Sequence, residues 1–433
     1  MTFDSLEEVK NGGVRDTPSF YGWRIVGLTF VTQFIAMGTF FYTLGVFLKP
    51  LTEALQTERF YVALALSLQQ VVIATLGPWV GKRIAERSIR ALMLWGTVLL
   101  TIGGLVISQA QSIWQLYLGY SLIIGAGVSL AGPLPNTALL ANWFVRKRGT
   151  AMGISQFGVT VSGTAMVPLA TWLIATYDWR TAMIVFAILP IALLAPVIHW
   201  VVVNRPEDRG LFPDGDIHPA DASEPVATDV GNDWTLKRAI RDRRVLLLAL
   251  TVGLNFMAMS SILQVLHSHF TDGGLSGSTA AQIVAVVTLA GAIAKPLFGA
   301  LADRINPRTV MGMSIALQIA GVAFIIQAAG VPFLMVGGAI FGLGYGGVLP
   351  LWGVLLGTLF GREHFGRVMG LMGPIMLPFQ MIGVPFATWV FDHYGTYTPA
   401  FIVFLGCYAV AAVALVFLPV PRHSRTTLAT SSS

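Results

Sequence analysis

Lys295 is the residue whose type and position most directly indicate chemistry. It lies inside an apolar run at 280–301, and it is the only charged residue in the interior of any long apolar run of the 433-residue chain. All 21 Asp and Glu residues lie outside these runs. An ionisable residue within an apolar span is costly and marks a functional site by default. A lone lysine there predicts an anion site and disfavours carriers of organic cations, which need a buried carboxylate.

The direction of the helix around Lys295 separates two interpretations of this residue. A lysine can extend its side chain to the membrane surface, but Asp303 near that surface is eight residues away, ~12 Å along a helix. The predicted direction of the span tilts its Cα–Cβ bonds toward the midplane, which opposes such an extension. We therefore expect Lys295 to face a central cavity, with Pro296 opening the helix beside it.

Other polar residues in the apolar runs could orient a substrate by hydrogen bonds. Each could instead join neighbouring helices, a role that contributes ~0.6 kcal/mol in membranes. Those that we consider as substrate-binding residues are Tyr42, Asn136, Asn255 and Tyr345. Asn136 and Tyr345 are the stronger candidates, because Gly and Pro interrupt the runs that contain them.

Catalytic chemistry is not indicated by the sequence. The single cysteine, Cys407, excludes a disulfide framework, and no Cys/His cluster has metal-ligand spacing. No nucleophile–base–acid set is apparent, and no Gly-Lys-Ser/Thr phosphate loop follows a strand. We therefore expect a protein that is not an enzyme and has no resident metal or cofactor.

The composition predicts a polytopic membrane protein. Of the residues, 55% are hydrophobic and 11% charged, whereas a soluble domain carries ~25% charged residues. A membrane-spanning helix needs ~20 apolar residues. We predict twelve of them, near residues 23–47, 61–81, 91–109, 114–140, 150–175, 181–203, 245–269, 280–301, 309–328, 332–359, 367–390 and 398–419.

The distribution of basic residues predicts the orientation. Of the 27 Lys and Arg residues, 23 lie on one side of the membrane if the N-terminus is cytoplasmic, and only Lys49, Arg59 and Arg180 lie on the other. This asymmetry follows the positive-inside rule. It predicts a multi-pass protein of the cell (inner) membrane with both termini cytoplasmic. Basic loops facing anionic membrane lipid then explain the net charge of +6, and no nucleic-acid partner is needed.

The chain also contains an internal repeat. The segment AMG at 151–153 recurs as VMG at 368–370, and PLATW at 168–172 recurs as PFATW at 385–389, each 217 positions later. The polar segment 204–244 stands between the two sets of six spans and reads as a solvated linker.

We therefore predict an all-α membrane protein of twelve transmembrane helices in two six-helix pseudo-repeats. The first bundle covers residues 1–203, the cytoplasmic linker 204–244 and the second bundle 245–433. This arrangement resembles the major facilitator superfamily. The segment GALADRINPR at 299–308 is similar to the cytoplasmic loop signature of that superfamily. The resemblance implies a gate in this region, with these gating residues: Asp303, Arg304, Arg146, Arg148 and Arg362.

Within the superfamily, the chain resembles the monocarboxylate transporter family and its bacterial relatives. The similar segments are YGW at 21–23, WFVRKRGTAMG at 143–153 and AKPLFG at 294–299. Lys295 stands where family members generally carry an arginine, and Gly291 where the animal members carry an aspartate. The resemblance implies transport of small organic anions.

We expect the substrate to be a monocarboxylate, such as lactate or pyruvate, paired with Lys295. A dicarboxylate would leave one charge unpaired in a low-dielectric cavity. Burial disfavours the charged form of a lysine, so an empty carrier could return with neutral Lys295, which favours proton symport over uniport or exchange. A formate/oxalate-type anion exchanger is the alternative, although Arg367 is the only basic residue at 367–390. A non-transporting receptor would be expected to carry a soluble domain.

Overall fold

The computed structural model describes residues 20–215, 234–327 and 330–419 of the chain. Every regular element within these ranges is a helix, and eleven helical stretches are long and apolar enough to cross a membrane. The predicted all-α membrane fold is therefore confirmed. The chain termini and residues 216–233 of the predicted linker lie outside the described residues.

Helices with short irregular segments form the first six spans. Three spans contain a π-helical segment, a feature that is frequent at functional sites. The elements are α1 (Gly22–Met37), η2 (Gly38–Tyr42) and α2 (Leu44–Ala54); α3 (Arg59–Glu86); α4 (Ile89–Ser108); α5 (Ile113–Leu116), η3 (Tyr117–Ile124), α6 (Gly125–Ala131) and α7 (Pro133–Trp143); α8 (Arg148–Thr176); and α9 (Trp179–Leu189), η4 (Pro190–Leu194) and α10 (Ala195–Val201).

The described part of the linker contains three short helices, η5 (Pro206–Arg209), η6 (Pro213–Gly215) and α11 (Leu236–Ala239). We call the end of the molecule that carries them the linker face, and the opposite end the far face. The second half then contains α12 (Arg243–Asp272), α13 (Gly277–Ala302), α14 (Pro307–Gln327), α15 (Val331–Gly346), α16 (Val348–Tyr394) and α17 (Thr398–Val416).

Two of the twelve predicted spans are joined in one continuous stretch. The stretch Val331–Tyr394 has 64 residues, and a straight helix of that length would measure ~96 Å, about three times the ~30 Å of a bilayer core. Gly361 interrupts it with φ 64° and ψ 178°, a conformation that is open essentially only to glycine. The chain therefore turns at Gly361 and crosses twice, which accounts for twelve spans.

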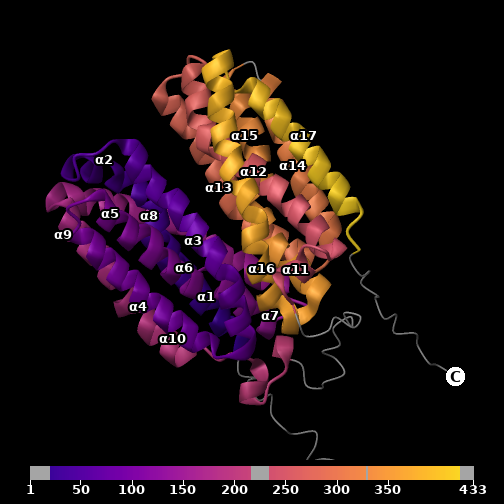
Figure 1. Cartoon of the computed structure of the whole chain (residues 1–433). Coiled ribbons are helices and arrows are strands. Elements are labelled where there is room, and N and C mark those ends of the chain that lie inside the picture. Colours follow the sequence, from indigo (N-terminus) through magenta and orange to yellow (C-terminus); the bar gives the residue numbers. More distant parts are fainter. Residues whose placement is uncertain (1–19, 216–233, 328–329, 420–433) are drawn as a thin grey trace, which may run out of the picture.

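Figure 1 shows the two halves as separate groups of helices. The α1–α10 group (indigo to magenta) and the α11–α17 group (pink through orange to yellow) come together near α7, α11 and α16, and they diverge toward α2 and α15. Across the boundary, α8 packs against α13 and α3 packs against α16. The bundles are therefore joined at the linker face and splayed toward the far face.

Glycine permits both of these inter-bundle crossings. A Cβ atom placed on Gly149 of α8 would lie 2.1 Å from the carbonyl oxygen of Gly299 on α13. A Cβ atom placed on Gly370 of α16 would lie 2.2 Å from the carbonyl oxygen of Gly77 on α3. Backbones can approach this closely only where small residues meet. Any side chain at these positions would force the linker face apart.

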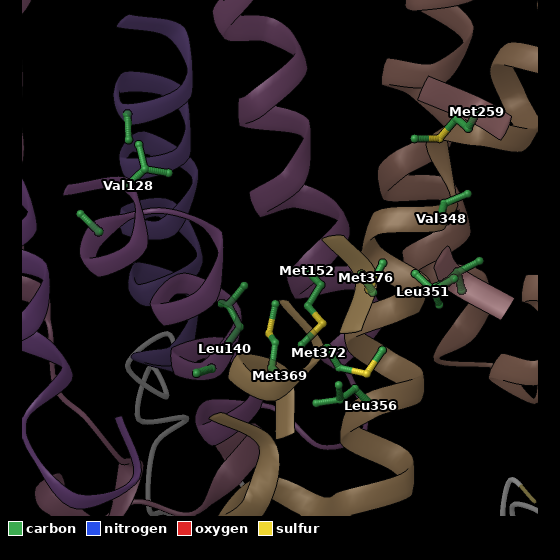
Figure 2. Close-up of a cluster of buried hydrophobic side chains, with 14 of the residues drawn as sticks. Val128, Leu140, Met152, Met259, Val348, Leu351, Leu356, Met369, Met372 and Met376 are labelled. Atoms are coloured by element: carbon green, nitrogen blue, oxygen red, sulfur yellow. The ribbon is translucent and has the colours of Figure 1, made fainter. Parts of the chain in front are cut away.

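Methionines fill part of the space between the bundles near the linker face. Met152 of α8 is 1% exposed, and a Cβ atom placed on Gly353 of α16 would lie 2.5 Å from its sulfur. Figure 2 shows Met152 in one cluster with Met369, Met372 and Met376 of α16. The flexible thioethers can adapt to a changing interface, so this cluster both seals the linker face and tolerates movement.

Candidate functional site

Lys295 lies at the contact between the two bundles. It belongs to α13 and is 4% exposed. Its ammonium donates a hydrogen bond to the carbonyl oxygen of Gln156 at 3.2 Å and another to the hydroxyl of Thr160, both on α8. A cation of the second bundle is thus held by neutral oxygens of the first.

The path of the Lys295 side chain agrees with the direction that we predicted. Its carbonyl oxygen would lie 2.6 Å from a Cβ atom on Gly153, so the backbones of α13 and α8 meet at this level. The ammonium reaches Gln156 and Thr160, which follow Gly153 along α8 and therefore lie farther from the linker face. The side chain therefore points away from the linker face and toward the middle of α8, as the predicted tilt of the Cα–Cβ bond requires.

Tyr42 and Tyr345 lie on the far side of Lys295, one from each bundle. A Cβ atom on Gly163 of α8 would lie 3.2 Å from the Tyr42 ring, and one on Gly291 of α13 would lie 2.4 Å from the Tyr345 hydroxyl oxygen. Gly291 precedes Lys295 by one helical turn, and Gly163 follows Thr160 by about one turn. Each bundle therefore contributes one tyrosine about one helical turn from the contacts of Lys295, on the side toward the far face.

The electrostatic character of this site is that of an uncompensated cation. Neither α8 nor α13 contains an acidic residue, and both acceptors of the Lys295 ammonium are neutral. A buried charge without a counter-charge is unfavourable, and an anion that reached it would relieve the imbalance. Within the described residues, no three His, Cys, Asp or Glu side chains are grouped so as to hold a metal ion.

The two asparagine candidates are both fully buried, and their surroundings differ. Asn136 on α7 donates from its amide to the carbonyl oxygens of Ala131 at 2.8 Å and Gly132 at 2.7 Å, the residues at the break between α6 and α7. Asn255 on α12 has no hydrogen-bond partner for either side-chain atom. Asn136 therefore stabilises an interrupted span, whereas the amide of Asn255 is left without a partner.

Asp303 joins the bundles at the linker face. Its carboxylate accepts hydrogen bonds from the backbone N–H groups of Gly149 at 2.6 Å and Thr150 at 2.8 Å, and from the Thr150 hydroxyl at 2.6 Å. These are donors of the first turn of α8, where a negative charge is favourable. Burial raises the pKa of the Asp303 carboxyl, while the hydrogen bonds from Thr150 and Gly149 oppose this rise. We call this set of hydrogen bonds between Asp303 and α8 the Asp303 latch. The cost of desolvating the carboxylate offsets part of the stabilisation that these hydrogen bonds give to the closed linker face.

The four arginines of the predicted gate occupy different surroundings. Arg304 and Arg146 are exposed. Arg148 is 4% exposed and donates to the carbonyl oxygens of Phe144 at 3.1 Å and Ala141 at 3.4 Å within its own bundle. Arg362 pairs with Glu207 of the linker. Arg362 thus ties the linker to the second bundle.

The linker itself supports the start of α8. Asp214 of η6 accepts hydrogen bonds from the backbone N–H groups of Val145 at 2.9 Å, Arg146 at 2.8 Å and Lys147 at 3.2 Å. Two carboxylates, Asp214 and Asp303, therefore accept from the backbone N–H groups on either side of Arg148, at the beginning of this helix. Neither the role of Asp214 nor that of Thr150 was predicted from the sequence.

A second interaction joins the two bundles at the linker face, and it was not predicted from the sequence. We call it the Glu86 latch. Glu86 at the end of α3 pairs with Arg367 of α16 at 3.1 Å. Adding the repeat offset of 217 to Glu86 gives Asp303, and adding it to Thr150 gives Arg367. The two latches are therefore equivalent positions of the internal repeat. The signal was present in the sequence as this offset, although the loop around Glu86 departs from the superfamily signature.

Two six-helix bundles that meet around a buried cation, closed at one end and splayed at the other, define a two-bundle membrane transporter. Comparison with known proteins agrees with this class. The family model described as Major Facilitator Superfamily matches residues 29–283 and 248–432. The chain belongs to the major facilitator superfamily.

Among curated relatives, the chain resembles monocarboxylate transporters. It is 25% identical to monocarboxylate transporter 13 of Rattus norvegicus, over 88% of this chain and 85% of the relative. It is 23% identical to monocarboxylate transporter 2 of Homo sapiens, over 92% of this chain and 84% of the relative. The predicted resemblance to this family is confirmed.

Solved structures share the fold. The proton:xylose symporter XylE superposes with a TM-score of 0.72 at 14% identity, covering 92% of this chain and 96% of that structure. The human organic anion transporter MFSD10 (TETRAN) gives a TM-score of 0.67 at 17% identity, covering 91% of this chain and 99% of that structure. At these identities the likeness concerns the architecture alone.

Proposed function

We propose that this protein is a secondary transporter of small monocarboxylates of the lactate and pyruvate type, working by alternating access in the cell (inner) membrane. The linker face and both termini are cytoplasmic in this proposal, as the positive-inside asymmetry indicates. The conformation described above is then the outward-facing one, because the bundles are joined at the linker face and diverge at the far face (Figure 1).

The observation that carries the proposal is the position of Lys295. Its ammonium lies between the bundles, has only neutral acceptors, and shares its surroundings with Tyr42 and Tyr345. A carboxylate that enters from the far face would pair with the ammonium, and we expect the two tyrosine hydroxyls to donate to the remaining lone pairs of its two oxygens. Asn255 is kept as a candidate contact because its amide has no partner. We leave Asn136 out, since its amide hydrogens are already donated to the backbone.

Gating follows from the two latches. Opening of the linker face requires Asp303 to leave the start of α8 and Glu86 to leave Arg367. The close glycine crossings of α8 with α13 and of α3 with α16 must separate in the same movement. Rocking of the bundles then exposes Lys295 to the cytoplasm and releases the substrate there.

Proton coupling can use the same lysine. Every Asp and Glu lies outside the predicted spans, so no membrane-embedded carboxylate is available as a proton carrier. A loaded carrier would hold a carboxylate beside protonated Lys295, and the empty carrier would return with the neutral amine, because an unpaired charge is unfavourable in a closed cavity. One substrate anion and one proton would then move together.

The formate/oxalate-type exchanger is the second candidate, and the surroundings of Arg367 argue against it. A second basic residue near the centre would be needed for a dianion. Arg367 lies at the linker face and pairs with Glu86, so Lys295 has no second cation beside it from that part of α16.

Counterflow in proteoliposomes tests the proposal. Vesicles loaded with unlabelled pyruvate should accumulate radiolabelled pyruvate or lactate, and unlabelled monocarboxylates should compete better than oxalate or succinate. Preferential competition by oxalate would support the exchanger. Absence of counterflow with every carboxylate, in vesicles that contain correctly folded protein, would reject both candidates.

A further inference from the structure

The acceptors that hold Lys295 come from the opposite bundle. Its ammonium on α13 bonds to the Gln156 carbonyl and the Thr160 hydroxyl on α8. Gln156 and Thr160 are four positions apart, so they lie on one face of that helix. A lysine ammonium has three donors and no acceptor. Two of these donors are therefore directed across the bundle boundary.

These hydrogen bonds can exist only while α8 and α13 are in contact. Gly153 meets the Lys295 backbone, and Gly149 meets Gly299 one turn nearer the linker face. Opening the linker face must separate this helix pair. The ammonium would then lose both acceptors, and neither α8 nor α13 offers a carboxylate in exchange.

We propose that Thr160 is a positioning residue whose hydroxyl tethers Lys295 across the two bundles while the linker face is closed, and that a bound carboxylate replaces this tether when the linker face opens. The first part of this inference concerns the empty protein and is independent of the substrate. The second part rests on the function proposed above. The tether would couple occupancy of the site to the movement of the bundles, so that an empty carrier with charged Lys295 stays outward-facing.

Thr160 is the part of the tether that a substitution can remove cleanly. The Gln156 contact uses a backbone carbonyl, which no side-chain change deletes. Valine has nearly the shape of threonine and keeps its branched Cβ, but it cannot accept a hydrogen bond. Thr160→Val therefore removes one of two acceptors from a buried ammonium, whereas Thr160→Ser keeps the hydroxyl.

The test measures how often the linker face opens without substrate. Met152→Cys, in a Cys407→Ala background, places a single thiol at a site that is 1% exposed between the bundles. Its labelling by a maleimide in lipid nanodiscs reports opening of the linker face. A hydrogen bond to a charged group is strong enough to shift such an equilibrium roughly tenfold. We expect Thr160→Val to label about ten times faster and Thr160→Ser to label at the parent rate.

A matched control variant and a double-mutant cycle distinguish loss of the hydrogen bond from a change in packing. Thr164→Val makes the same chemical change one turn along α8, where the hydroxyl is exposed and bonds only to the Val161 carbonyl at 2.7 Å, and it should label at the parent rate. Lys295→Met should also speed labelling. Adding Thr160→Val to Lys295→Met should give no further increase, because both changes break the same bond.

Three outcomes would overturn the tether: Thr160→Val labels at the parent rate, Thr160→Ser accelerates labelling as much as Thr160→Val, or the effects of Thr160→Val and Lys295→Met simply multiply. Pyruvate distinguishes this failure from failure of the proposed function. Pyruvate should accelerate labelling of the parent protein, which keeps Thr160, more than labelling of the Thr160→Val variant. If pyruvate changes neither rate while the substrate-free differences hold, the tether stands and the monocarboxylate assignment is rejected.

Discussion

Replacing Lys295 is the sharpest perturbation of the proposed binding site. Lys295→Gln keeps a polar side chain, one atom shorter, and removes the positive charge. Lys295 is 4% exposed, and its ammonium has no acidic neighbour on α8 or α13. Because no other cation lies in the interior of a predicted span, we expect no other residue to take its place when a carboxylate enters.

The expected loss follows from the burial of the pair. Removing one partner of a buried ion pair costs ~3–5 kcal/mol, because the other charge is left uncompensated. At ~1.4 kcal/mol for each factor of ten, affinity for a monocarboxylate should fall roughly 100-fold to 4,000-fold. Lys295→Arg should retain part of the transport, since the guanidinium keeps the charge but differs in size and hydrogen-bond geometry.

Uptake of radiolabelled pyruvate into proteoliposomes and its binding to purified protein measure this effect. The matched control is Lys49→Gln, because Lys49 has a side chain 73% exposed and pairs loosely with Glu53 at 3.9 Å. That variant should transport at the parent rate. Full transport by Lys295→Gln, with normal insertion and folding, would show that Lys295 does not bind the anion.

Three further perturbations test the gate and the coupling. Asp303→Ala leaves three α8 donors without their acceptor and should speed labelling of Met152→Cys about tenfold, because the loss of three hydrogen bonds of ~1 kcal/mol each is partly offset by relief of the carboxylate's desolvation. Glu86→Gln should change the rate less than threefold, as expected for an exposed pair, and the reverse order would refute our ranking. Gly299→Ala should keep the linker face open and reduce uptake at least tenfold, because its Cβ would meet the Gly149 carbonyl and such overpacking costs ~1–3 kcal/mol. Normal uptake by this variant would show that the crossing of α8 and α13 is not tight. Pyruvate added to vesicles loaded with a pH dye should acidify the lumen only when active protein is present, and uptake without a pH change beyond that of protein-free vesicles would reject proton symport.

The sequence was sufficient to predict the features that depend on local pattern. Apolar length and the 217-residue repeat predicted twelve spans, and two of these spans form one stretch that Gly361 interrupts. The tilt of Cα–Cβ bonds along a helix predicted that Lys295 points to the midplane. Its contacts with Gln156 and Thr160 show this direction.

Contacts between distant parts of the chain were not predictable in the same way. Nothing in the local sequence of α8 marks Thr160 as the partner of a lysine 135 positions away. Asn136 illustrates the same limit, because a polar residue in an interrupted span is equally consistent with substrate contact and with support of the break, and its hydrogen bonds to Ala131 and Gly132 belong to the second role. Pairing across the bundles is a property of packing, which periodicity does not encode.

The two latches differ in strength although they occupy equivalent positions of the repeat. Glu86 and Arg367 form an ion pair with side chains 40% and 21% exposed, and exposed pairs contribute only ~0–1 kcal/mol. Asp303 instead accepts three hydrogen bonds at the start of α8, where the helix dipole adds to them, and its desolvation removes part of that gain.

The stronger latch therefore lies on the helix pair that also carries Lys295. The contact of α3 with α16 includes the glycine crossing at Gly77 and Gly370 and the Glu86–Arg367 pair, and Lys295 is on neither helix. Closure of α8 on α13 combines the Asp303 latch, the crossing of Gly149 with Gly299 and the bonds of Lys295 to α8. A substrate that pairs with Lys295 would directly change only the contacts between α8 and α13. In the proposed mechanism, we therefore expect the bound anion to control the gate through α8 and α13, with separation of α3 from α16 as a consequence of that movement.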